Sequence, residues 1–138
     1  MRLDREPQVD EIICADYNYD AAARLEKTLT KARAVQVDGS NIDDVLNAAR
    51  GAALLVNGLP PDFNLTLMKA ALQGNINYQD MASGPVADTD FVSAVKRQLA
   101  LDENFKSAGL SALINTGSAP GLVNVIARNS ADKLDRCD

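Results

Sequence analysis

The chain has 138 residues, of which 46% are hydrophobic, enough for one domain with a buried core. Its formal net charge is −5 and it has no basic stripe, which argues against binding nucleic acid or an anionic membrane surface. It contains no histidine, so histidine-based catalytic triads and histidine-containing metal sites are excluded.

The apolar runs and the cysteines predict a cytoplasmic protein. No apolar run approaches the roughly 20 residues that span a bilayer, and residues 1–6 carry no apolar signal-peptide segment. The two cysteines lack metal-ligand spacing, so we predict no metal site. Cys14 lies in an apolar run and is predicted to be a buried free thiol, and Cys137 lies near the chain end.

Strand and helix patterns alternate along the whole chain. Short apolar runs bounded by turn residues predict strands at 11–15, 34–37, 52–56, 76–81 and 110–115. Apolar residues at helical spacing predict helices at 21–29, 42–49, 63–73, 91–108 and 122–134. Because each strand is followed by a helix, we expect an α/β fold of the Rossmann type, a doubly wound parallel sheet.

Several residues mark the predicted boundaries in the first half of the chain. The first strand ends at Asp16, and Asp20 is the predicted N-cap of the following helix. The second strand ends at Asp38, and Gly51 closes the helix after it. The run at 52–56 has no polar residue, which is typical of a strand buried on both faces.

The second half continues the pattern. Asp62 is the predicted cap of the third helix and Gly74 its stop. Asp90 is the predicted cap of the helix over 91–108, which we expect to break near Leu99 and to end at Gly109.

Acidic residues end the first two strands. An acid at the end of the second strand of a dinucleotide-binding fold holds the adenosine ribose hydroxyls, and Asp16 fits that role. No arginine follows Asp16, which favours NAD over NADP, although NADP stays possible. Asp38 is in position to reach the adenine edge. The alternative is that both aspartates only open turns.

The third and fourth strands end in residues that suit the other half of a dinucleotide. Asn57, Gly58, Leu59 and Pro60 form a turn in which glycine permits close approach of the backbone to a pyrophosphate or a nicotinamide ribose. Asp80 ends the fourth strand on the same rim and is predicted to line the nicotinamide site. The alternatives are ordinary turn chemistry and a solvated loop carboxylate.

A glycine-rich turn over 116–121 precedes the last helix. Its backbone N–H groups can face an anion or a carboxylate substrate, which would put Ser118, Pro120 and Gly121 near the substrate. The segment is not a P-loop, since the Lys-Ser/Thr ending is absent. The alternative is an ordinary tight turn.

One expected motif is missing. The G-x-G-x-x-G turn of a dinucleotide fold lies about 20 residues before the ribose-binding acid, which here would fall before Met1. We therefore expect a fragment: residues 1–122 as a partial NAD(P)-binding domain without its first strand and glycine-rich turn, and residues 123–138 as the start of a helix that leads to a substrate domain.

The motifs together carry a family resemblance. The segments are 15–16, 35–38, 55–61, 78–80, 108–109 and 117–124, of which Asn-Gly-Leu-Pro-Pro and Ala-Pro-Gly-Leu-Val-Asn are the most specific. In this order they resemble the saccharopine dehydrogenase family, and more narrowly the NAD(P)-binding domain of saccharopine dehydrogenase and lysine 6-dehydrogenase-like proteins.

The resemblance implies an oxidoreductase that acts on C–N bonds of amino acids, with hydride passing between nicotinamide and the carbon that bears the amine. It places Asp16 on the adenosine ribose, Asp38 near adenine, and residues 57–60 beside the pyrophosphate and nicotinamide ribose. Asp80 and the turn at Pro120 would border the nicotinamide and a small amino acid substrate. No general base is assigned, and a non-catalytic nucleotide-binding or regulatory module is the alternative.

The missing strand has physical consequences. In the usual strand order it is central, so its neighbours are left with unpaired edges, and we expect the chain to be marginally stable or to self-associate, for example as a homo-oligomer. The helix N-terminus that holds the pyrophosphate is also missing, so we expect weak NAD binding.

Overall fold

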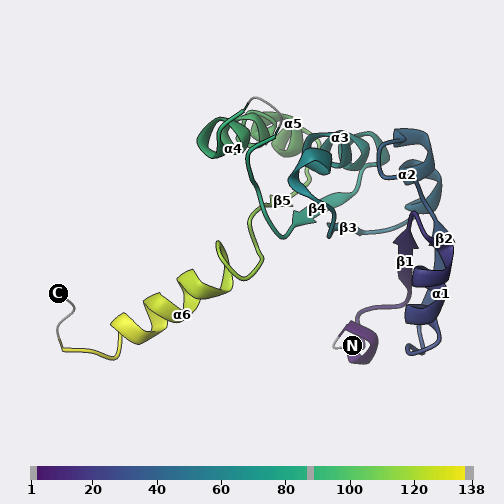
Figure 1. Ribbon diagram of the computed structural model, residues 1–138, viewed down its shortest axis with the longest axis horizontal. Coiled ribbons are helices and arrows are strands. Elements are labelled where there is room, and N and C mark those ends of the chain that lie inside the picture. Colours follow the sequence, from purple (N-terminus) through teal and green to yellow (C-terminus); the bar gives the residue numbers. More distant parts are fainter. Residues whose placement is uncertain (1–2, 87–88, 136–138) are drawn as a thin grey trace. The chain divides into compact units, whose positions relative to one another are not determined.

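The computed structural model describes residues 3–86 and 89–135. The chain divides into two compact units, Met1–Ala52 and Ala53–Asp138. Each unit combines helices with parallel strands (Figure 1). The predicted α/β class with parallel strands is therefore confirmed.

The first unit holds one pair of strands. Its elements are η1 (Leu3–Arg5), β1 (Ile12–Asp16), α1 (Tyr19–Glu26), β2 (Ala32–Gln36) and α2 (Ile42–Ala48). β1 and β2 pair in parallel, with Ile12 opposite Ala32 and Asp16 opposite Gln36. The described residues of this unit include four buried apolar side chains, all of them small: Cys14, Ala22, Val37 and Val45. Cys14 is thus buried as predicted, and burial raises the pKa of its thiol. Cys137 lies outside the described residues.

Side-chain caps and a clasp fix the ends of these elements. The N-cap of α1 is Asn18, whose Oδ1 accepts the Asp20 N–H at 3.0 Å, so the prediction of Asp20 as the cap was wrong. Asp4 accepts the backbone N–H groups of Lys31 and Thr30 at 3.0 and 2.8 Å, which joins η1 to the start of β2. The hydrogen bond from the Lys31 N–H is the main reason why the pKa of Asp4 is lowered.

The second unit holds three strands and most of the core. Its elements are β3 (Leu54–Asn57), η2 (Pro61–Phe63), α3 (Asn64–Gly74), β4 (Asn77–Asp80), α4 (Phe91–Leu99), α5 (Asp102–Ser107), β5 (Ala112–Leu113) and α6 (Leu122–Ala131). The strands pair in parallel in the order β3-β4-β5. Helices α3, α4 and α5 lie along one side of this sheet (Figure 1). Leu67, Met68, Tyr78 and Phe105 are among its buried side chains.

Some predicted features of this unit were wrong. β3 is not buried on both faces: Leu54 and Val56, whose side chains alternate onto the same face of the strand, are 47% and 46% exposed. Asp62 does not cap α3, which instead follows a 3-10 turn without a side-chain cap. Gly74 is the last helical residue, and Asn75, with φ of 55°, takes the left-handed position that ends the helix.

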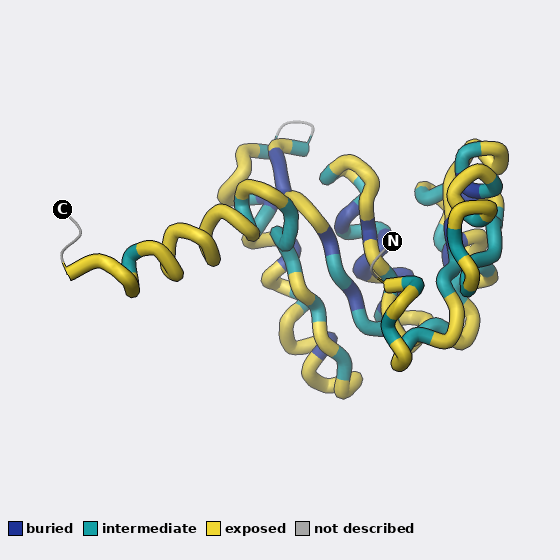
Figure 2. The backbone as a smooth tube through the Cα atoms, turned by 90° about the horizontal axis from the view of Figure 1, so that it is seen from below, coloured by how far each residue is buried: buried dark blue, intermediate teal, exposed yellow. Residues whose placement is uncertain are grey.

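Other features are confirmed. Asp90 caps α4 through the Ser93 N–H at 3.0 Å, and the predicted helix breaks after Leu99. Gly109 has φ of +67° and follows Ala108, the C-cap of α5. Helix α6 has no buried residue and is exposed along its length (Figure 2). None of the helices in the described part of the chain is long and apolar enough to cross a membrane.

The five strands form two sheets rather than one. Among the described strands β1 pairs only with β2, and β3 pairs only with β4. In a Rossmann-type order these two strands would be the neighbours of the first strand.

Candidate functional site

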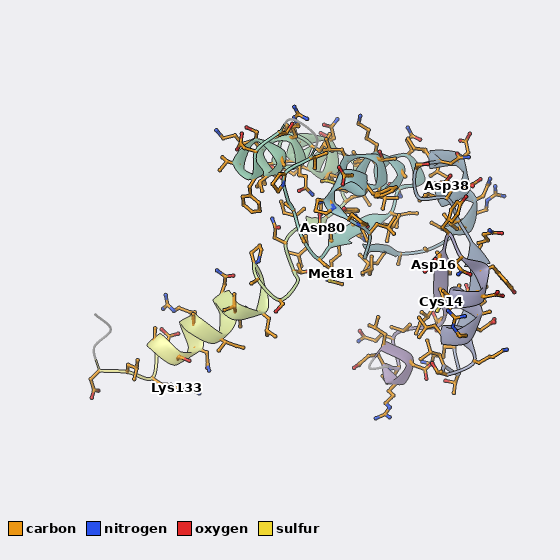
Figure 3. The ribbon with its side chains drawn as sticks, viewed as in Figure 1. Cys14, Asp16, Asp38, Asp80, Met81 and Lys133 are labelled. Carbon is orange, nitrogen blue, oxygen red and sulfur yellow. The ribbon has the colours of Figure 1, made fainter. Side chains whose placement is uncertain are left out.

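In the first unit two predicted site residues follow neighbouring strands at the same edge. Asp16 is the last residue of β1, and Asp38 comes two residues after β2. The Val37 N–H donates to the Asp16 carbonyl at 3.0 Å, so the two chain segments run side by side up to this point. Asp16, Asp38 and the buried Cys14 are labelled in Figure 3.

The two carboxylates differ in how they are held. Asp16 is exposed, and its Oδ1 accepts the Asn18 N–H at 2.8 Å. Asp38 accepts both the hydroxyl and the backbone N–H of Ser40 through its Oδ1, at 2.6 and 2.9 Å. These bonds, the one from the Ser40 hydroxyl foremost, lower the pKa of Asp38. Both aspartates thus shape the turns they open, and the Asp16 carboxylate is accessible to a ligand.

In the second unit the ends of β3 and β4 bring Asn57 and Asp80 together. They are partners in the strand register, and their side chains are 2% and 1% exposed. The Oδ1 of Asn57 accepts the Leu59 N–H at 2.9 Å. Gly58, Leu59 and Pro60 are exposed, so a buried asparagine anchors an exposed turn.

A hydrogen-bonded network of buried side chains extends from Asn57. Its Nδ2 donates to Asn64 Oδ1 at 2.8 Å and to the Tyr78 hydroxyl at 3.0 Å. The Asn64 Nδ2 donates in turn to the Ala82 carbonyl at 2.9 Å. Burial is the main reason why the pKa of Tyr78 is raised, with the hydrogen bond from Asn57 opposing and the charge of Asp80 adding to the shift. Tyr78 is therefore neutral and can donate.

Asp80 is the other centre of this network. Its Oδ2 accepts the Gln98 Nε2 at 2.7 Å and the Tyr78 hydroxyl at 3.2 Å, and its Oδ1 accepts the Asn115 N–H at 2.7 Å. The Ser83 hydroxyl donates to Gln98 Oε1. The interpretation of Asp80 as a solvated loop carboxylate is wrong, because Asp80, which is labelled in Figure 3, is 1% exposed.

The turn before α6 is fastened to the end of β4. The Gly117 N–H donates to the Met81 carbonyl at 2.9 Å, and a Cβ on Gly117 would lie 2.3 Å from that oxygen. Gly121 has φ of +128°, and its Cβ would lie 2.2 Å from the Gly117 carbonyl oxygen. Only glycine fits these two positions.

The N–H groups at the start of α6 are already used within the turn. Leu122 and Val123 donate to the carbonyls of Gly117 and Ser118 at 2.8 and 3.0 Å, and Gly121 donates to Asn124 Oδ1 at 3.0 Å. Within the predicted turn, the N–H groups of Gly117 and Gly121 are therefore already bonded inside the chain. Ser118 is exposed, while Pro120, which follows a cis peptide bond, is half-buried.

Sequence reasoning missed most of the network. Asn64, Ser83, Gln98 and Asn115 were not predicted to act in the site. Gln98 carried a signal, since it lies four residues after Ala94 on the buried side of α4 and interrupts an otherwise apolar face. The side chains of Tyr78 and Asp80 share one face of β4 by strand alternation.

Acids and glycine turns at the carboxyl ends of parallel strands are the arrangement by which α/β domains bind nucleotides. The chain matches the model of the saccharopine dehydrogenase NADP binding domain over residues 2–113. It belongs to that family, whose members bind a nicotinamide dinucleotide. The resemblance predicted from the sequence is thereby confirmed.

Two relatives and one solved structure give the extent of the similarity. Carboxynorspermidine synthase of Vibrio cholerae is 28% identical over 127 residues, covering 83% of this chain and 30% of the relative. Carboxyaminopropylagmatine dehydrogenase of Synechocystis sp. is 32% identical over 97 residues, covering 69% of this chain and 24% of the relative.

Apo saccharopine dehydrogenase (L-Glu forming) from Saccharomyces cerevisiae superposes with a TM-score of 0.75 and 14% identity, covering 96% of this chain and 27% of the yeast chain. At this identity the match supports the fold. The chain therefore spans less than a third of the length of these relatives.

Proposed function

We propose that this chain forms part of the dinucleotide site of an oxidoreductase that acts on C–N bonds of amino acids, as saccharopine and lysine dehydrogenases do. The family match supports the cofactor class. One similar protein is named a dehydrogenase, carboxyaminopropylagmatine dehydrogenase, and the similar solved structure is a saccharopine dehydrogenase. These names fit hydride transfer. When bound, the cofactor supplies the redox chemistry, and the protein supplies position and electrostatics.

The observation that carries the proposal is the exposed carboxylate of Asp16 at the end of β1. A carboxylate accepts hydrogen bonds from both ribose hydroxyls and repels a 2′-phosphate. The next residues are Tyr17 and Asn18, neither of which is basic. We therefore propose NAD rather than NADP as the cofactor of this chain, with Asp38 on the adenine side.

The second unit would hold the other half of the cofactor. Residues 57–60 are proposed to lie beside the pyrophosphate and nicotinamide ribose, because their turn is exposed yet anchored through Asn57. The turn that contains Ser118, Pro120 and Gly121 is proposed to border the nicotinamide and the substrate, with the buried Asp80 supporting this end of the site from beneath. Helix α6 would lead from there towards a substrate-binding part.

The test is a titration of the isotope-labelled chain with NADH and with NADPH, followed by amide resonances, which detect weak binding as well as tight. We expect NADH to bind more tightly than NADPH. Loss of charge-assisted bonds in Asp16→Asn is expected to weaken NADH binding about tenfold, and the preference for NADH should shrink. Asp20→Asn, which removes the same charge four residues away, is the matched control. Tighter binding of NADPH, or equal effects of the two variants, would refute the assignment.

A non-catalytic module that binds only the adenosine half of a nucleotide is the second candidate. It is favoured by Asp16 and Asp38, which stand together at one edge of the first unit. AMP in the same titration separates the two proposals. The second candidate is favoured if AMP and NADH bind with equal affinity and shift the same resonances, and if neither ligand shifts resonances of residues after Ala52.

A further inference from the structure

Asp80 is a buried carboxylate that is held by neutral donors. It is 1% exposed, and none of the ion pairs formed by the described residues includes it. A buried carboxylate without a cation is costly unless its oxygens accept several hydrogen bonds. Asp80 has three such bonds, from Gln98, Tyr78 and Asn115. Burying a carboxylate therefore needs a reason beyond filling the core, since an apolar side chain would fill the same space without the cost of desolvating a charge.

One carboxylate oxygen fixes the backbone at Asn115. Asn115 has φ of +60°, a left-handed conformation that is uncommon for a residue with a Cβ, although asparagine tolerates it better than most. Asp80 Oδ1 accepts its N–H, and Asn115 Oδ1 accepts the Ser83 N–H at 2.7 Å. The next residue, Thr116, donates its N–H and its hydroxyl to the Asp80 carbonyl at 3.1 and 2.7 Å. The turn before α6 thus starts from a backbone geometry set by Asp80.

The other oxygen reaches the first turn. Asp80 Oδ2 accepts the Tyr78 hydroxyl, which accepts the Asn57 Nδ2, and Asn57 in turn holds the Leu59 N–H. The hydrogen bonds therefore run without interruption from the backbone of Leu59 to the backbone of Asn115. Both turns belong to the same unit of the chain.

We propose that Asp80 is a positioning residue, whose buried carboxylate couples the turn at 57–60 to the turn at 115–121 and sets both in the geometry that receives the nicotinamide end of the cofactor. The part that concerns the cofactor rests on the proposed function. The coupling between the two turns does not depend on the proposed function. In this role Asp80 acts through Tyr78, Asn57 and Asn115 and does not touch the ligand.

Asp80→Asn is the first variant. The amide keeps an acceptor for the Asn115 N–H but places an N–H₂ group against two donors, Gln98 Nε2 and the Tyr78 hydroxyl. The double variant Asp80→Asn/Gln98→Glu restores a donor–acceptor pair between positions 80 and 98, with the carboxylate moved to residue 98. Phe105→Leu is the matched control, since it destabilises the core of the same unit without a part in the network.

The first readout is amide hydrogen exchange in the whole chain, which needs no ligand. We expect Asp80→Asn to reduce protection of the Asn115 and Leu59 amides about tenfold more than that of amides in α3, and the double variant to recover most of it. Phe105→Leu should lower protection evenly across the unit. Two results would overturn the coupling. One is a uniform loss of amide protection across the unit in Asp80→Asn, and the other is a loss of protection at Asn115 without a loss at Leu59.

The second readout is NADH binding, measured by the same resonance shifts. If the unaltered chain binds NADH, Asp80→Asn should weaken binding by at least about fivefold more than Phe105→Leu does, and the double variant should restore it. Equal weakening in the two single variants would refute the link to the cofactor. If the unaltered chain does not bind NADH, the proposed function fails for this chain, and the exchange data alone decide whether Asp80 couples the turns.

Discussion

Tyr78→Phe tests the network with the smallest change. The substitution removes one oxygen atom from a side chain that is 1% exposed, and with it two hydrogen bonds. The bond to the Asp80 carboxylate is long, at 3.2 Å, so we assign it the low end of the range for charged acceptors, about 1.5 kcal/mol. The bond from Asn57 adds less than about 1 kcal/mol, because Asn57 Nδ2 keeps Asn64 as a partner.

The expected loss of stability is therefore about 2 kcal/mol, which corresponds to a fall in Tm of roughly 8 °C for a chain of this size. The assay is urea unfolding followed by circular dichroism, with exchange of the β4 amides to report on this unit alone. Tyr17→Phe is the matched control, because Tyr17 is 73% exposed and should change stability by less than about 0.5 kcal/mol. If the two variants are equally stable, the Tyr78 hydroxyl is not a working member of the network.

Three further predictions concern other parts of the chain. The pKa of Asp4 is lowered by backbone hydrogen bonds, so the contribution of Asp4 to stability is present above about pH 4 and is lost as the pH falls through the folded-state pKa. When the free energy of unfolding is measured against pH, Asp4→Asn should therefore not show this acid-induced loss of stability. Gly121→Ala should cost at least about 2 kcal/mol in urea unfolding, whereas Gly58→Ala, whose Cβ would meet nothing within 4 Å, should be near neutral. Sedimentation velocity should show self-association that Val56→Lys, on the exposed face of the edge strand β3, reduces more than Val125→Lys on α6 does. A monomer at every concentration would refute this prediction.

Much of the fold was predictable because it depends on local patterns. Alternation of apolar runs with helical spacing gave the order of strands and helices, and the Asp90 cap and the Gly109 stop followed from local backbone chemistry. The errors arose where more than one local solution existed. Asn18 and Asp20 are both good caps, and only the course of the chain decides between them. β3 appeared fully buried because its apolar run does not reveal whether both faces of the strand are covered, and Leu54 and Val56 lie on an exposed face.

The candidate site was predictable only at its rim. Asp16, Asn57 and Asp80 are recognisable because they end strands, and strand ends are where α/β folds place polar side chains. Which of these residues is exposed and which is buried depends on tertiary packing. Gln98 comes from a helix 18 residues further along the chain than Asp80, and no local spacing relates the two.

The burial of so many amides beneath one rim has a structural reason in the brevity of β5. That strand has two residues, so the regular ladder with β4 ends at the Gln79–Leu113 pair, and beyond it the Thr116 and Gly117 N–H groups donate to the Asp80 and Met81 carbonyls. The turn at 57–60 is likewise exposed and lies at the end of an edge strand. Neither turn belongs to the regular strand ladder, so the buried side chains beneath them add to the local backbone hydrogen bonds that hold them. A carboxylate suits this task better than a neutral group, because it accepts from three sides at once and each bond to it is stronger. The position of the rim is thus built into the unit before any ligand arrives, as preorganised binding requires.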